Sequence, residues 1–226
     1  MSRGATWRAM VCGAALSLFA SGWPAHAKAG DHARQKASEL AFRALDSAFA
    51  CMMHRNPGRV RAYMGTVPGS NREQVIGSYL YHQLGDCLSK ASAVGISGVI
   101  GRGIAAERLL AVDFPTSPPP SPPVEPGEFG PIAGPMQVDG GIASAYAFAR
   151  CIVIADPAGV RGLTGTARGS AAEARVLRAM RPRFPPCVAR GATLKTDRWT
   201  IRPFLAEALY QVYRSRAGAG AARVRS

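Results

Sequence analysis

An internal repeat with an offset of 100 residues constrains the fold of this chain more than any other feature. When residues 51–110 are aligned without gaps on residues 151–210, 14 of the 60 positions are identical. An unrelated alignment of ordinary composition would give roughly four or five identities. Each segment contains two cysteines, and these align with each other. The match predicts a tandem duplication and provides an internal control, because a site common to both copies must occur twice.

The first 27 residues have the pattern of a secretory signal peptide. Two arginines precede the apolar segment Val11–Ala20, which is too short for a stable membrane span, and Ala25-His26-Ala27 fits the small-x-small cleavage pattern. We therefore expect an exported protein, in the periplasm or outside the cell, whose mature chain begins near Lys28. We expect no membrane span after the signal.

Four cysteines follow the predicted signal, and export places them where disulfides persist. Four cysteines allow three pairings. Because both copies keep the same spacing of 36 residues, we favour Cys51–Cys87 and Cys151–Cys187. In the chain-entropy model, closing a loop of this length stabilises the fold by about 3.8 kcal/mol.

The hydrophobic pattern predicts an all-α fold in which each copy is a unit of three helices. The first helices are expected over about residues 35–53 and 142–154, where apolar residues recur at helical spacing. Pro57 and Pro157 follow soon afterwards, and we expect them to end the helical stretch.

The second helix of each copy has the clearest local signal. Ser70-x-x-Glu73 and Ser170-x-x-Glu173 are capping boxes, in which the serine hydroxyl accepts from the amide three residues later. The glutamate is expected to reach back to the serine amide. These four residues are predicted to cap helices and not to perform catalysis.

The third helices carry matched charged residues beside apolar neighbours. Arg102 and Glu107 align with Arg202 and Glu207, and Pro203 is expected in the first turn of its helix. Because the two glutamates lie in mid-helix among apolar residues, we interpret the four charged residues as structural ion pairs between helices. Ligand binding by these residues is the alternative.

The composition between the copies suggests a linker. Nine prolines within residues 115–135 predict an extended spacer, and the C-terminal residues show no apolar periodicity. The predicted organisation is a signal peptide (1–27), a first helical unit (28–112), a Pro-rich linker (113–137), a second helical unit (138–214) and a disordered basic tail (215–226).

Positive charge is concentrated in the second copy. Residues 138–226 carry a net charge of +10, against +5 for residues 28–112. Arg175, Arg178 and Arg181 are spaced to lie on one side of a helix, where they could bind anionic lipid or another polyanion. The alternative is a solvated basic face, since 24 arginines against 4 lysines also fit a GC-rich coding background. Nucleic acid is not favoured, because no aromatic stacking platform accompanies the arginines.

A zinc site and an enzymatic site are the remaining alternatives. Cys51, His54, His82 and Cys87 could together form a tetrahedral zinc set. The aligned positions of the second copy keep both cysteines but replace the histidines with isoleucine and proline. Disulfides explain why both copies keep their cysteines, whereas a zinc site would explain only the first copy. We therefore expect no metal, and we also expect no cofactor and no catalytic site.

The sequence therefore predicts an exported, non-catalytic helical repeat protein that binds another envelope macromolecule or acts as a structural module. Binding of anionic lipid or polyanion through the second unit is the first alternative, and an envelope enzyme or metal protein is the second. The partner is expected to be an envelope protein or an acidic surface. Neither its identity nor the oligomeric state follows from the sequence.

Overall fold

Helices account for all the regular structure in the part of the chain that the computed structural model describes, residues 26–88, 98–121, 123–133, 140–190 and 198–223. The all-α class is confirmed for these residues. The α-helices are α1 (His26–Arg55), α2 (Pro57–Met64), α3 (Asn71–Leu84), α4 (Gly98–Asp113), α5 (Gly140–Ala155), α6 (Pro157–Thr164), α7 (Ala171–Met180) and α8 (Arg198–Arg223). Short 3₁₀ helices are η1 (Gly85–Cys87), η2 (Pro126–Phe129), η3 (Arg181–Arg183) and η4 (Pro185–Cys187). Most of the predicted signal, residues 1–25, lies outside the described residues. Residues 36–226 form one compact unit, and the description below concerns that unit.

The helices form two corresponding halves, a first half of α1–α4 and a second half of α5–α8. The prediction of three helices per copy is wrong, because Pro57 and Pro157 begin α2 and α6 instead of ending the helical stretch. Asn56 and Asp156 precede them and act as N-caps, each accepting from the amide two residues after the proline. Proline suits this first helical position, where an N–H group would have no intrahelical partner.

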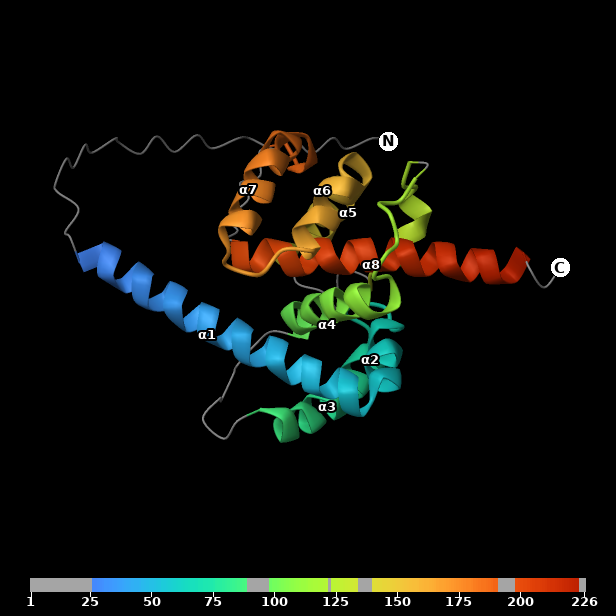
Figure 1. The fold of residues 1–226 in the computed structure, drawn as a ribbon, viewed down its shortest axis with the longest axis horizontal. Helices are drawn as coiled ribbons and strands as arrows, with labels where there is room; N and C mark the ends of the chain where they lie inside the picture. Colours follow the sequence, from blue (N-terminus) through green and yellow to red (C-terminus); the bar gives the residue numbers. More distant parts are fainter. Residues whose placement is uncertain (1–25, 89–97, 122, 134–139, 191–197, 224–226) are drawn as a thin grey trace, which may run out of the picture. The chain divides into compact units, whose positions relative to one another are not determined.

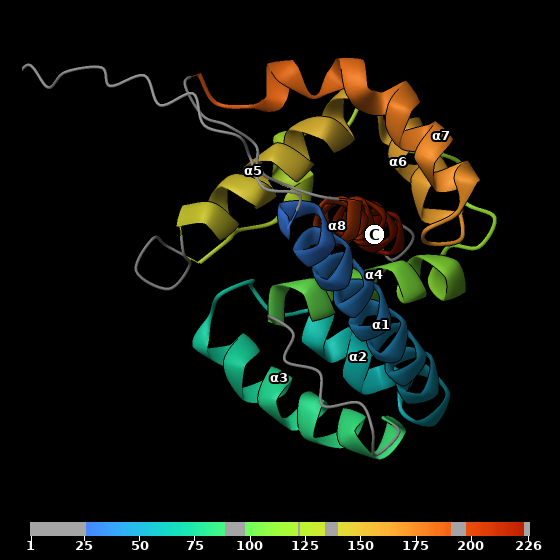
Figure 2. The ribbon, with the colours of Figure 1, turned by 90° about the vertical axis from the view of Figure 1, so that its left-hand side faces the viewer.

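The pair α4 and α8 lies at the centre of the unit and joins the halves. Both views show α2 and α3 on the α4 side of this pair and α5, α6 and α7 on the other side (Figures 1 and 2). The helices cross at Gly103 and Pro203, which are aligned positions of the two copies. A Cβ atom at Gly103 would lie 2.3 Å from both the Cβ and the carbonyl oxygen of Pro203. Pro203 is the sixth residue of α8 and not in its first turn, because α8 already begins at Arg198.

One hydrophobic core includes residues from both halves. Phe49 and Leu109 from the first half belong to the same buried cluster as Ile152 and Leu205 from the second. Phe42 also stacks on Trp199 at the start of α8, with ring centroids 5.6 Å apart. The two predicted units thus share their core.

Both predicted disulfides are confirmed. Cys51 of α1 bonds Cys87 in η1, and Cys151 of α5 bonds Cys187 in η4, each with a sequence separation of 36 residues. Each bond therefore ties the first helix of a half to a 3₁₀ helix that follows its third α-helix.

The proline-rich segment is packed against α8, so its description as an extended spacer is wrong for the described residues. Val124 and Phe129 are buried, and Arg216 of α8 pairs with Glu128. Tyr213 donates to the carbonyl of Pro118 at 2.6 Å. Residues 215–223 continue α8 and do not form the expected disordered tail, whose last residues, 224–226, lie outside the described residues.

The apolar composition of α5 raises the question of a membrane span. In the residues that the structure describes, no single helix is long and apolar enough to span a membrane. Residues 141–155 and α6 pass that test of length and composition together, but they meet at an angle of 108°.

Candidate functional site

The charged residues predicted to form ion pairs meet where α4 and α8 cross, and their partners are exchanged between the halves. Arg102 of α4 donates through Nε to Oε1 of Glu207 in α8 at 2.7 Å, and both side chains are fully buried. Tyr146 of α5 donates to the other oxygen of Glu207 at 2.8 Å. Arg102 also donates to Glu73 at 3.2 Å and to the hydroxyl of Thr66 at 2.9 Å.

The aligned residues make the reciprocal set of contacts. Arg202 of α8 pairs with Glu107 of α4 and donates to Oε1 of Glu173 at 2.7 Å. Arg168 forms a further ion pair with Glu107. Each buried arginine therefore contacts the capping glutamate of its own half and the mid-helix glutamate of the other half.

Burial and neighbouring charges act on these groups in opposite directions. Burial lowers the pKa of Arg102, but Glu207, Tyr146, Glu73 and Tyr63 together outweigh this effect, and the pKa is raised overall. Burial raises the pKa of Tyr146, and the charge of Glu207 adds to that increase. Burial and the nearby Arg202 lower the pKa of Arg168 to about 10. Because the carboxylates are engaged by arginines or a tyrosine, this network ties α3, α4, α5, α7 and α8 together and supports the fold.

The predicted cap residues occupy the starts of α3 and α7. The hydroxyls of Ser70 and Ser170 accept from the amides of Glu73 and Glu173, each at 3.1 Å. The glutamate side chains reach the amide of the glycine before each serine, and not the serine amide itself. Glu73 and Glu173 therefore have two roles. Each caps the start of its helix, and each also accepts a hydrogen bond from a buried arginine, Arg102 or Arg202.

The histidines of the zinc alternative do not form a metal site with the cysteines. Cys51 and Cys87 are consumed by their disulfide, His54 is exposed, and His82 lies on α3. Within the described ranges, no group of three or more His, Cys, Asp or Glu side chains is arranged to hold a metal ion.

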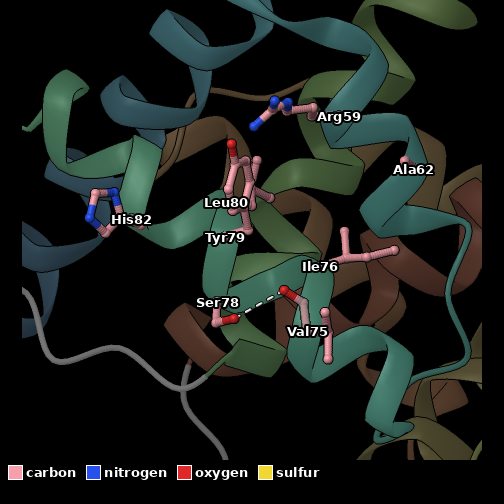
Figure 3. Close-up of a pocket in the computed structure, with 8 residues that line it drawn as sticks. All are labelled: Arg59, Ala62, Val75, Ile76, Ser78, Tyr79, Leu80 and His82. Carbon is pink, nitrogen blue, oxygen red and sulfur yellow. Dashed lines mark hydrogen bonds between the residues drawn. The ribbon is translucent and has the colours of Figure 1, made fainter.

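An apolar groove between α2 and α3 is the candidate binding site (Figure 3). Its volume is about 770 Å³. Val75 and Tyr79 are 69% and 58% exposed, and together they place apolar surface on the outer side of α3. The guanidinium of Arg59 lies 4.5 Å above the ring of Tyr79. The described lining residues are Arg59, Ala62, Val75, Ile76, Ser78, Tyr79, Leu80 and His82.

The helix that corresponds to α3 has the opposite surface chemistry. On α7, Arg175 and Arg178 occupy the positions of Val75 and Ser78, and both arginines are exposed. Arg181 follows in η3 and is also exposed. We call these three arginines the α7 ridge. The spacing of the arginines in the sequence identified the ridge. The groove was not predicted, because the sequence pattern alone does not show that Val75 and Tyr79 are exposed.

Comparisons with protein-family models, with curated proteins and with solved structures found no match. The site must therefore be interpreted from its own geometry.

Proposed function

We propose that this chain is an exported, non-catalytic binding protein that arose by duplication of a helical unit and binds an envelope component in the α2–α3 groove. The predicted signal, the 14 identities between the copies and the matching disulfides support the export and the duplication. The engaged carboxylates of the central network support a non-catalytic role. An envelope enzyme or metal protein has the least support, because a single disulfide joins Cys51 and Cys87, the two cysteines of its zinc set.

The observation that carries this proposal is the difference between α3 and α7. Their inner sides are alike, since Ile76 and Leu80 align with Val176 and Met180. Their outer sides differ, because α3 exposes Val75 and Tyr79 where α7 carries arginine and alanine. The fold therefore does not require the exposed apolar residues of α3, and binding is a direct reason for their presence.

Affinity capture from an envelope extract tests the groove. The baits are the purified mature protein, the variant Val75→Ser/Tyr79→Ala, and a control with the three arginines of the α7 ridge changed to alanine. We expect a component that the wild type and the ridge variant retain and the groove variant loses. Equal capture by all three baits, or turnover of a small substrate without capture, contradicts the proposal.

Binding of a polyanionic surface through the α7 ridge is the second candidate function. It is favoured by the exposure of Arg175, Arg178 and Arg181 and by their proximity along one helical segment. It predicts binding to vesicles of anionic lipid that weakens steeply with salt and falls when the three arginines become alanine. The control is Arg55→Ala/Arg72→Ala, which removes exposed arginines of the first half. Salt-independent binding contradicts this function.

A further inference from the structure

The lining of the α2–α3 groove combines apolar surface with positive charge. Val75, Ile76 and Leu80 supply aliphatic surface, and Tyr79 supplies an aromatic ring. Arg59 is the permanently charged residue of the lining, and the described lining residues include no aspartate or glutamate. A complementary occupant therefore has an apolar body and a negative charge.

Arg59 has an unused hydrogen-bonding group at this site. Its Nη1 atom is buried and has no hydrogen-bond partner among the described residues, although the guanidinium rests on the ring of Tyr79. A buried donor without an acceptor is costly, and a carboxylate matches the forked geometry of a guanidinium group and can form two parallel hydrogen bonds with it. Figure 3 shows Arg59 over Tyr79, with Ala62 and Ile76 towards one end of the groove and His82 towards the other.

The second half again supplies the internal control. Gly159 and Ala179 stand at the positions of Arg59 and Tyr79, so this half has no corresponding stack of arginine on tyrosine. The helices α6 and α7 nevertheless form and pack against each other. The Arg59–Tyr79 stack is thus not needed to hold such a helix pair together.

The size of the groove favours a small molecule over a protein segment. Pockets for small ligands have volumes of about 300–1,000 Å³, and this groove has about 770 Å³. We infer that the groove binds a single-chain amphiphile with a carboxylate head group, the chemistry of a fatty acid. The chain lies along Val75 and Tyr79, and the carboxylate binds Arg59. This inference rests on the proposed function, since it names the ligand class of the same groove.

Calorimetric titration of the mature protein with laurate tests the inference, and dodecanol is the uncharged probe with the same chain. We expect laurate to saturate one site and to bind about tenfold or more tightly than dodecanol, as a charge-assisted hydrogen bond implies. Arg59→Met should weaken the binding of laurate by a similar factor and leave the affinity for dodecanol unchanged. Val75→Ser/Tyr79→Ala should abolish binding of both probes. Val75 and Tyr79 are exposed, so their double variant should keep the wild-type circular dichroism spectrum. Arg59 is half-buried, and the same spectrum checks the fold of Arg59→Met. The matched control, Val112→Ser on α4, removes an exposed apolar side chain outside the groove and should bind laurate like the wild type.

Four results would overturn the inference. Equal affinity for laurate and dodecanol, or an Arg59→Met variant that binds laurate normally, means that the groove does not recognise a carboxylate. Failure of laurate to bind, together with capture of an envelope peptide or protein that depends on Tyr79, rejects the amphiphile but keeps the proposed function. If laurate does not bind and no captured component depends on the groove residues, both the amphiphile and the proposed function are rejected.

Discussion

At the scale of single residues, Glu207 shows how strongly its surroundings constrain a buried charge. It is fully buried and receives Arg102 from the first half and Tyr146 from the second. A buried carboxylate is tolerated only when paired charges and hydrogen bonds offset its desolvation. The stability of the molecule therefore depends on a contact between side chains that are far apart in the sequence.

Replacing Glu207 with glutamine should lower the free energy of unfolding by about 3–5 kcal/mol, because Arg102 then keeps a buried charge without its nearest counter-charge. Chemical denaturation followed by circular dichroism measures this loss. The control is Glu39→Gln, which breaks the pair of Glu39 with the largely exposed Arg43 and should change stability little. If the two substitutions lower the free energy of unfolding equally, the buried pair contributes no more to stability than the exposed one, which contradicts the prediction.

The buried tyrosines predict sensitivity to alkaline pH. Burial raises the pKa of Tyr81 and of Tyr210 from 10.0 to about 12. Because the folded state favours the neutral phenol, this stabilisation is complete below pH 10.0 and is lost as the pH rises to about 12. The free energy of unfolding should fall across this interval, and Tyr210→Phe should make the fall less steep. An unchanged slope in Tyr210→Phe contradicts the assignment.

At the scale of elements, the sequence predicted helices whose signals are local and failed where the outcome depends on tertiary contacts. The serine–glutamate pairs place the starts of α3 and α7 correctly, since capping needs only four consecutive residues. Pro57 suggested a helix end, although Asn56 before it already carried the N-cap signal for α2. The C-terminal part of α8 has no apolar periodicity of its own, and contacts such as that of Arg216 with Glu128 accompany its continuation.

The crossing of α4 and α8 yields a prediction about one glycine. Gly103→Ala should destabilise the protein by about 1–3 kcal/mol, because its methyl group would overlap Pro203 and the adjoining backbone. Gly162→Ala in α6 is the matched control, since a Cβ atom there meets no other atom within 4 Å. The control should stabilise the protein by about 0.4–1 kcal/mol. Denaturation midpoints measure both, and an equally tolerated Gly103→Ala would contradict the close crossing.

At the scale of the whole molecule, the alignment of the copies did not predict how they assemble. It identified Arg102, Glu107, Arg202 and Glu207 as a matched set, but spacing along the chain cannot show which arginine contacts which glutamate. The reciprocal exchange between α4 and α8 requires the two copies to be folded together. The prediction of an extended spacer was wrong for a similar reason. The composition of the proline-rich segment excludes a helix interior, but it does not show that Val124 and Phe129 are buried. The groove depends on a comparison of the outer faces of α3 and α7, which becomes informative only once burial is known.

The exchanged ion pairs imply that neither half is stable alone. A separated first half would keep Arg102 without Glu207 and Glu107 without Arg202, and it would expose its share of the common core. Unfolding should therefore be a single cooperative transition in which both halves take part.

Removal of one disulfide tests this cooperativity. Cys51→Ala/Cys87→Ala opens a loop in the first half only, and the chain-entropy model predicts a loss of about 3.8 kcal/mol. If the halves unfold together, hydrogen exchange at the buried residues Ile152 and Val153 of α5 should report the same loss, although α5 belongs to the other half. Cys151→Ala/Cys187→Ala should in turn reduce protection in α4 around Leu109. Loss of protection confined to the half that carries the substitution would show that the halves unfold independently despite their shared ion pairs.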